Sequence, residues 1–352
     1  MPIERFCIFM FRLESKPAAS LGSRAIKIVI RYTNQNSPTS AFVTSARRCG
    51  VEIGAEYRRG FECCRRISQE IAMHAAIRHS TVTTSHGSIA FQESGAGARA
   101  VLFIHGNSSC SEVFRQQLRG RLAHGRRLIA LDLPGHGLSS NAPDPSRTYT
   151  RGGFADAAVE LLQTLDIAEA VVVGWSLGGH IGIDMLTRYT GMRGLMIVGT
   201  PPVGRDTMRE GFMGLPQAGA AGRKTLSDAD IDGFMQAIFG ESPEPFLRDA
   251  MIRSDGRFRE HLFQAMRADD YADQRVLVKN SAVPIAVLNG ADDKIINLDY
   301  LDRVAFRNLW EARCHRLPDA GHAPFWQQAA HFDSVLERFL DDVESGRAAR
   351  PI

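Results

Sequence analysis

The segment VVVGWSLGG at residues 171–179 is the strongest indication of the fold of this chain. Three consecutive valines are typical of a strand that is buried on both faces of a parallel sheet. The residues from His180 onward have the apolar spacing of a helix. Between them, GWSLG matches the pattern G-x-S-x-G, in which small neighbours allow a sharp strand-to-helix turn that raises the serine hydroxyl above the sheet. We therefore predict that Ser176 is a nucleophile, the alternative being a purely structural glycine-rich turn.

Outside this segment, short apolar runs alternate with stretches of helical spacing. Strands are expected at 101–104, 128–131, 171–173, 195–198 and 285–288, after a hairpin formed by 81–85 and 88–92. Helices are expected at 112–118, 154–165, 180–189 and 331–340. Strands that alternate with helices predict an α/β fold with a mostly parallel central sheet flanked by helices.

One interval, about 203–278, interrupts this alternation. It contains no strand-like run, but has glycine-rich text at 211–222 and helical patterns at 231–239 and 258–266. Long insertions over strand ends commonly form lids or substrate pockets. We therefore predict one domain over residues 81–345, with a helical cap inserted at about 203–278.

The first 80 residues differ in composition from the rest. They hold 13 of the 42 basic residues and 6 of the 39 acidic ones, a net charge of +7, whereas the whole chain carries only +3. The paired arginines follow no helical face and have no interleaved aromatic residues, which argues against a nucleic-acid-binding tail. We predict an N-terminal extension of uncertain status, with Met73 as the natural start of the protein.

The remaining composition indicates an ordinary globular protein, since 44% of the 352 residues are hydrophobic and 23% are charged. No apolar run approaches the roughly 20 residues that a membrane-spanning helix needs. The six cysteines form no CxxC pair and no zinc-like spacing. The expected protein is therefore cytoplasmic, without a membrane segment, structural metal or cofactor.

A nucleophilic serine needs a base, and the base needs an orienting carboxylate, in the chain order serine, acid, histidine for this kind of turn. His322 follows a glycine late in the chain and is the predicted base. Asp292 and Asp293, which follow the strand at 285–288, both remain candidates for the acid on their position alone.

Charge that develops on a substrate oxygen needs preorganised N–H donors. Leu177, the residue after the predicted nucleophile, supplies one donor. The loop HGNSS at 105–109, directly after an expected strand, is predicted to supply the other from the backbone of Asn107. The Asn107 side chain either points toward the substrate or caps its own loop.

These motifs resemble the α/β-hydrolase fold family over residues 81–340. The resemblance is carried by HG at 105–106, DLPGHGLS at 132–139, the serine turn, Gly290 with an acid three residues later, and GH at 321–322. It implies that Asp293 rather than Asp292 is the acid. It also implies that Asp132 and His136 are architectural.

A narrower resemblance is to the serine-dependent N-acylhomoserine lactonases of this fold. It rests on HGNSS, on GWSLGGHIGIDM at 174–185, on MRGLMIVGTPPV at 192–203 and on AGHAPF at 320–325. It implies ring opening of a lactone, a small-molecule substrate, through an acyl-enzyme. The alternatives are a general carboxylesterase or C–C bond hydrolase of the same fold, and a non-catalytic ligand-binding member.

An acyl chain would require an apolar pocket. Aromatic and sulfur-containing side chains near the motifs or in the predicted cap are the candidates, and the alternative for each is an ordinary core position. They are Trp175, Phe212, Met213, Phe234, Phe325 and Trp326. The sequence predicts neither the acyl-chain preference nor the oligomeric state.

Overall fold

The computed structural model describes residues 76–214, 221–240, 243–266 and 272–348, together with two N-terminal strands. The chain divides into two compact units, Met1–Met73 and His74–Ile352. In the first unit, β1 (Met10–Glu14) pairs with β2 (Lys27–Arg31) in antiparallel orientation. The predicted start at Met73 lies outside the described residues and stays a prediction.

The second unit is built on an eight-stranded sheet with the order β10-β9-β8-β7-β5-β6-β4-β3. Its strands are β3 (Arg78–Thr84), β4 (Gly87–Gly95), β5 (Arg99–Ile104), β6 (Arg126–Leu131), β7 (Ala170–Trp175), β8 (Met192–Val198), β9 (Ile285–Gly290) and β10 (Leu309–Leu317). The pairs β3·β4 and β4·β6 are antiparallel, and all other neighbours are parallel. The predicted hairpin and mostly parallel sheet are confirmed.

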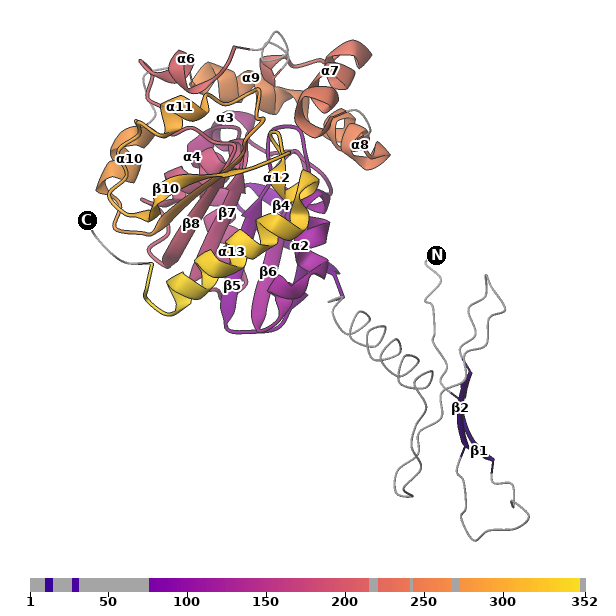
Figure 1. Ribbon diagram of the computed structural model, residues 1–352. Coiled ribbons are helices and arrows are strands. Elements are labelled where there is room, and N and C mark those ends of the chain that lie inside the picture. The colour runs from indigo at the N-terminus through magenta and orange to yellow at the C-terminus, as the bar shows by residue number, and fades with distance from the viewer. Residues whose placement is uncertain are drawn as a thin grey trace, which may run out of the picture. The chain divides into compact units, whose positions relative to one another are not determined.

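Helices cover both faces of this sheet (Figure 1). Those outside the cap are η1 (Ser111–Phe114), α2 (Arg115–Arg119), η2 (Arg121–Ala123), α3 (Pro145–Thr148), α4 (Arg151–Thr164), α5 (Leu177–Met185), α11 (Leu298–Leu301), α12 (Pro324–Gln327) and α13 (Ala329–Glu344). Helices α2, α12 and α13 lie on one face, whereas α4 and α5 lie on the other. The predicted helix near the C-terminus is thus part of a longer helix, α13.

Each face of the sheet has its own apolar core, because successive strand residues point to opposite faces. Leu102 of β5 belongs to the core on the side of α4, together with Phe154. Its neighbour Phe103 belongs to the core on the side of α13, together with Phe339. The central strands are therefore apolar throughout, as expected for a parallel sheet that is covered on both faces.

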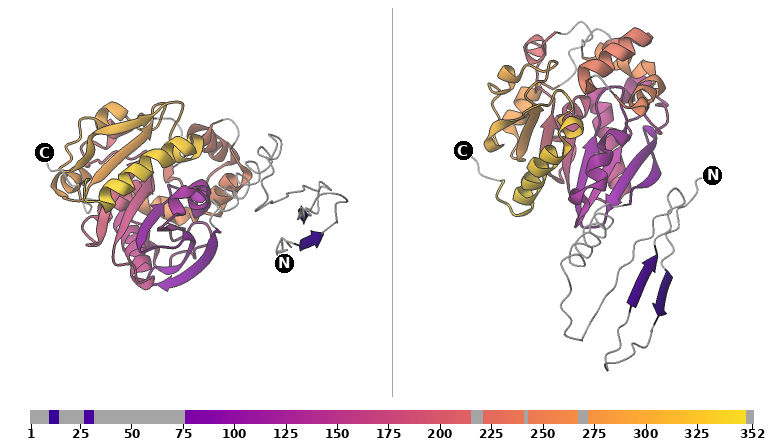
Figure 2. Two further views of the ribbon diagram at one scale, coloured as in Figure 1. Left: turned by 60° about the horizontal axis from the view of Figure 1, so that its bottom comes forward. Right: turned by 45° about the vertical axis from the view of Figure 1, so that its right-hand side comes forward.

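All secondary-structure elements described between β8 and β9 are helices. They are α6 (Met208–Gly211), α7 (Asp228–Phe239), α8 (Pro245–Arg253), α9 (Gly256–Ala265) and α10 (Gln274–Asn280). Helix α7 begins with a capping box, in which Ser227 and Asp230 each accept a hydrogen bond from the other's backbone N–H. Figures 1 and 2 show α7, α8 and α9 grouped at one end of the sheet, and we call this group of helices the cap.

Strand β10 was not among the predicted strands. It lies at the edge of the sheet, and in the middle of its sequence LWEARCHRL the residues Glu311, Ala312 and Arg313 are exposed. Glu311 and Ala312 have positive φ angles of 52° and 51°, and the pairing with β9 shifts register between Leu309 and Cys314. An irregular, exposed edge strand lacks the continuous apolar run on which the other strand predictions depended.

Candidate active site

Ser176 occupies the sharp turn between β7 and α5. Its φ of 54° is in the left-handed region, which residues other than glycine rarely adopt. Backbone strain of this kind is typical of functional turns. The Ser176 N–H donates to the carbonyl of Val198, 2.8 Å away, which ties the turn to β8. A Cβ at Gly174 would lie 2.3 Å from the carbonyl oxygen of Gly178, and one at Gly178 would lie 2.1 Å from that of Ile104. Both glycines are therefore required by close backbone approach.

His322 and Asp293 form a buried pair. Nδ1 of His322 lies 2.9 Å from Oδ2 of Asp293, and their side chains are 2% and 0% exposed. The other carboxylate oxygen of Asp293 accepts hydrogen bonds from the backbone N–H groups of Ile295 (2.8 Å) and Ile296 (3.2 Å). Asp292 is exposed instead. The structure therefore brings Asp293, and not Asp292, to the histidine.

The surroundings of Asp293 favour its ionised form. Burial alone would raise the pKa of this carboxyl group, but the contact with His322 and the two backbone N–H donors outweigh it. The net effect holds the pKa of Asp293 below its ordinary value. A carboxylate therefore faces His322 at neutral pH and can fix the orientation of the ring.

The carboxyl ends of β7, β8 and β9 bring the histidine loop to the serine turn. The indole N–H of Trp175, the residue before the predicted nucleophile, donates to the carbonyl of His322 at 2.8 Å. A Cβ at Gly199, directly after β8, would lie 2.9 Å from Cε1 of the His322 ring. The N–H of Gly199 in turn donates to Oδ1 of Asn289 in β9. The histidine loop is thus joined to the serine turn through Trp175 and to the end of β8 through Gly199.

The loop after β5 packs against the serine turn. A Cβ at Gly106 would lie 3.2 Å from Cβ of Ser176 and 3.0 Å from the Trp175 ring. The Asn107 side chain does not extend freely from this loop: its Nδ2 donates to the carbonyl of Ala221, and its Oδ1 accepts from Oγ of Ser108. The side chain therefore holds the loop, which leaves the backbone N–H of Asn107 as the proposed donor.

Leu177 is the first residue of α5. The first N–H groups of a helix have no acceptor within the helix, and the helix dipole places partial positive charge there. Leu177 therefore has the backbone position that a second oxyanion donor needs, directly after Ser176.

Two residues of the motif at 132–139, Asp132 and His136, make buried contacts within the fold. Asp132 accepts hydrogen bonds from the backbone N–H of Ser111 (2.6 Å) and of Leu138 (2.8 Å). His136 is fully buried, and its ring packs at a tilt against that of Phe258, with 4.2 Å between the ring centroids. Burial holds the pKa of His136 well below its ordinary value, so the ring is neutral. These contacts agree with the architectural roles that the family resemblance implied.

The predicted pocket residues separate into two groups. Trp175 and Phe325 are 1% and 0% exposed, and their rings pack against each other at 5.1 Å within the core. The other four are partly buried or exposed and belong to the cap side or to α12: Phe212, Met213, Phe234 and Trp326. Only this second group has side-chain surface that a ligand could contact without rearrangement of the core.

Phe239, which the sequence did not single out, connects the two groups. It ends α7, and its ring lies 5.8 Å from the ring of Trp175 and 6.1 Å from that of Trp326. In the sequence, Phe239 was recognisable only as the last residue of the helical pattern at 231–239, which gave no indication of a place near the site. Its proximity to the serine turn depends on how the cap folds back over the sheet.

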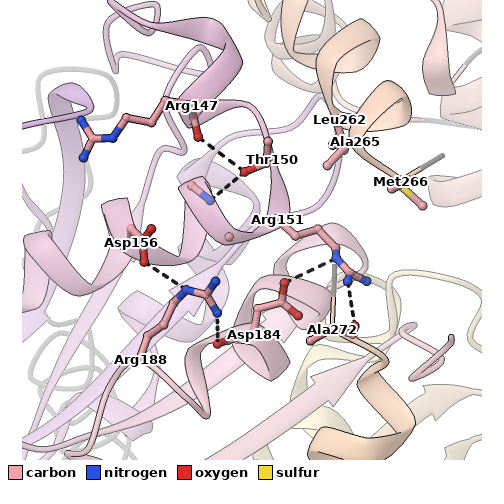
Figure 3. Close-up of a pocket in the computed structure, with 12 residues that line it drawn as sticks. Arg147, Thr150, Arg151, Asp156, Asp184, Arg188, Leu262, Ala265, Met266 and Ala272 are labelled. Atoms are coloured by element: carbon pink, nitrogen blue, oxygen red, sulfur yellow. Dashed lines mark hydrogen bonds and ion pairs between the residues drawn. The ribbon is translucent and has the colours of Figure 1, made fainter. Parts of the chain in front are cut away.

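A separate cavity of about 390 Å³ lies beside α4, α5 and α9 (Figure 3). Both acidic side chains that line it are paired with arginines: Asp184 contacts Arg151, and Asp156 contacts Arg188. Neither Ser176 nor its predicted partners line this cavity. We therefore do not assign the active site to it.

The described ranges contain neither of two other kinds of site. Within these ranges, no three His, Cys, Asp or Glu side chains gather in a group that could hold a metal ion. None of the helices described there is long and apolar enough to cross a membrane.

Comparison with known proteins defines the class of this molecule. The model of the alpha/beta hydrolase family matches residues 101–332, and the chain belongs to this family. Among solved structures, that of N-acyl homoserine lactonase AidH complexed with N-butanoyl homoserine is 46% identical. The match covers 76% of this chain and 97% of that one, with a TM-score of 0.74.

More distant relatives have other descriptions. The AB hydrolase superfamily protein YisY of Bacillus subtilis (strain 168) is 25% identical over 74% of this chain and 98% of its own length. A 2-hydroxy-6-oxononadienedioate/2-hydroxy-6-oxononatrienedioate hydrolase from a Pseudomonas species is 26% identical over 72% of this chain and 92% of its own length. The chain is thus a hydrolase of this family, and among these three proteins its sequence identity is highest to the lactonase.

Proposed function

We propose that this protein is a serine hydrolase that opens the lactone ring of N-acyl homoserine lactones. The observation that carries the proposal is the buried His322–Asp293 pair beside the Ser176 turn, in a chain 46% identical to N-acyl homoserine lactonase AidH. A second solved structure, of an AidH mutant complexed with N-hexanoyl homoserine lactone, is 45% identical over the same share of this chain. N-acyl homoserine lactones are quorum-sensing signals of bacteria, so their hydrolysis would make the protein a quorum-quenching enzyme.

The first half of the proposed reaction forms an acyl-enzyme. His322 takes the proton from Ser176 Oγ as this oxygen attacks the lactone carbonyl carbon. The negative charge on the carbonyl oxygen is stabilised by the backbone N–H groups of Asn107 and Leu177. The ring C–O bond then breaks, and His322 returns the proton to the leaving alkoxide, which becomes the free hydroxyl of homoserine.

The second half releases the product. His322 takes a proton from water, the resulting hydroxide attacks the ester between Ser176 and the homoserine carbonyl, and the proton returns to Ser176 Oγ as the bond breaks. Throughout both halves Asp293 stays ionised, because its pKa is held low, and stabilises the imidazolium. The amide of the acyl chain takes no part, so the product is N-acylhomoserine.

The second candidate is an esterase or a C–C bond hydrolase with the same catalytic residues. The 26% identical Pseudomonas hydrolase supports this candidate, since the same fold serves a different substrate there. A non-catalytic ligand-binding protein is the third candidate. The complete set of a serine turn, a histidine–carboxylate pair and two backbone donors argues against it.

The experiment uses purified full-length protein and its Ser176→Ala variant with N-hexanoyl homoserine lactone at pH 7. Mass spectrometry follows the products, and a sample without protein measures spontaneous ring opening. We expect a product that has gained one water, with the amide intact, only when Ser176 is present. Hydrolysis of nitrophenyl esters without lactone turnover would shift the assignment to the esterase, and tight binding without any turnover would favour the binding protein.

A further inference from the structure

One buried arginine of the cap reaches the loop after β5. Arg259 of α9 is 3% exposed, and its Nη1 donates to Oγ of Ser108 at 2.8 Å. Its Nε and Nη2 donate to the carbonyls of Arg223 (2.7 Å) and Lys224 (3.2 Å), which precede α7. A single guanidinium therefore joins α9, the segment that leads into α7, and the loop that carries Asn107.

The connection continues from Ser108 to Asn107. Oγ of Ser108 accepts from Arg259 and donates to Oδ1 of Asn107 at 2.6 Å. Nδ2 of Asn107 donates to the carbonyl of Ala221, again in the cap insertion. Successive hydrogen bonds polarise and strengthen one another, and this series of hydrogen bonds begins at the Arg259 guanidinium cation. Both side chains of the loop are thereby held by groups that belong to the cap insertion.

The backbone of this loop needs such support. Ser108 has a φ of 56°, a conformation that side chains other than glycine rarely adopt. A residue in such a conformation keeps it only when its surroundings impose it. Asn107, whose N–H is the proposed oxyanion donor, directly precedes this strained residue, and its side chain is held by the same set of contacts.

The burial of the Arg259 guanidinium is unfavourable in free energy. Taking a guanidinium out of water carries a desolvation penalty, and within the described residues its three hydrogen bonds go to neutral oxygens rather than to a carboxylate. Burial accordingly lowers the pKa of Arg259. The ring of Phe258 beneath it, 5.2 Å from the guanidinium carbon, compensates in part. An apolar residue would fill this position at lower cost, so the hydrogen bonds themselves are the reason for an arginine.

We infer that Arg259 is a positioning residue, which holds the Asn107 N–H in place for the oxyanion by way of Ser108. The oxyanion hole is then complete only when α9 is seated against the loop after β5. Cap position and catalytic competence are thereby coupled. This inference rests on the proposed function in one respect, since it requires catalysis through an oxyanion.

The test compares Arg259→Met, Ser108→Ala and the double variant with the wild-type protein. Arg257→Met is the matched control, because Arg257 is on the same helix but pairs with Asp255 and is 42% exposed. Two rates are measured below the melting temperature: hydrolysis of p-nitrophenyl butyrate per active site, and inactivation by diethyl p-nitrophenyl phosphate. When Ser176 attacks the phosphorus atom of this inhibitor, negative charge develops on the phosphoryl oxygen, and this charge also needs the oxyanion hole.

We expect both rates to fall about 10-fold to 100-fold in each single variant, as for a misplaced catalytic group. The double variant should lose no more than the more impaired single variant, because both changes break one chain of contacts. Arg257→Met should stay within about 2-fold of wild type, since an exposed ion pair contributes little. Should Arg259→Met fail to fold, Arg259→Lys and Ser108→Ala provide the same comparison.

Folded variants with wild-type rates, or losses that are additive in the double variant, would overturn the positioning role while leaving the hydrolase assignment intact. A wild-type protein that is inert to esters, lactones and the phosphate would overturn the proposed function, and this inference with it.

Discussion

Nδ1 of His322 lies 2.9 Å from Oδ2 of Asp293, although 29 positions separate the two residues in the chain. Asp293 follows β9, and His322 follows β10, the neighbouring parallel strand. Because parallel strands end at the same edge of the sheet, their two following loops meet there. The pairing is therefore a consequence of sheet topology.

Replacement of the acid tests this relationship. Asp293→Asn should lower kcat/KM for the substrate about 10³-fold to 10⁴-fold, because an amide neither stabilises the imidazolium nor enforces the required tautomer. The measurement is steady-state kinetics on N-hexanoyl homoserine lactone or a nitrophenyl ester. Asp292→Asn is the control and should be nearly neutral, since Asp292 is exposed. Equal losses in the two variants would contradict the assignment.

The serine turn should not tolerate a methyl group at Gly178. A Cβ there would lie 2.1 Å from the carbonyl oxygen of Ile104, so Gly178→Ala must displace β5 or the turn. We expect a loss of about 3 kcal/mol or more in the free energy of unfolding, measured by urea denaturation. Gly240→Ala is the control: Gly240 has a φ of +85°, but an added Cβ would have no atom of the described residues within 4 Å, so we expect only the backbone penalty of about 1–2 kcal/mol. Similar losses at both positions would argue against the close contact.

Asp333 should make the protein less stable above pH 6. Burial raises the pKa of Asp333 to about 6, although Gln117 donates a hydrogen bond to its carboxyl group. In the unfolded chain the Asp333 carboxyl group has an ordinary pKa of about 3.9. Between about pH 4 and 6 the folded state therefore binds more protons than the unfolded state, and the free energy of unfolding falls as the pH rises.

Asp333→Asn removes this effect while it keeps the acceptor for Gln117. We therefore expect a gain of roughly 1–3 kcal/mol in the free energy of unfolding at pH 7.5, which shrinks toward zero at pH 4. Urea denaturation at both pH values measures it. A gain that is the same at pH 4 and pH 7.5 would show that the carboxyl group is not the cause.

Chelation of metal ions should leave the activity unchanged. Every step of the proposed reaction uses protein groups, namely Ser176, His322, Asp293 and two backbone donors. Prolonged incubation with EDTA, followed by removal of the chelator and the same kinetic assay, should preserve at least about 90% of kcat/KM. A strong loss that zinc or another divalent ion restores would count against the serine route.

Much of the fold follows from local sequence. The central strands β5 to β9 have continuous apolar runs because both faces of the sheet are covered, and this pattern needs no knowledge of the partner strands. Strand β10 lacks such a run, since it is an edge strand with a register shift, and local patterning failed there. Boundaries were also imprecise: the predicted helix 180–189 is α5, Leu177–Met185.

The candidate site divides in the same way. Ser176 could be predicted because its turn imposes small residues at fixed positions in one short segment. Trp175 and Phe325 were candidates for pocket residues, yet they lie in the core, because a side chain's exposure depends on elements distant in sequence. Phe239 was missed for the same reason.

Local sequence patterns were sufficient to predict the serine turn, the alternation of strands and helices up to β9, and the residues eligible as acid and base. These depend on interactions between residues close in the chain. Position in the chain left Asp292 and Asp293 both open, and the family resemblance favoured Asp293. The tertiary structure was needed to show that Asp293 meets His322, and that Arg259 reaches Ser108 across 151 positions. Such contacts arise when strand ends and the cap converge, and no local pattern encodes which of several suitable side chains will then face one another.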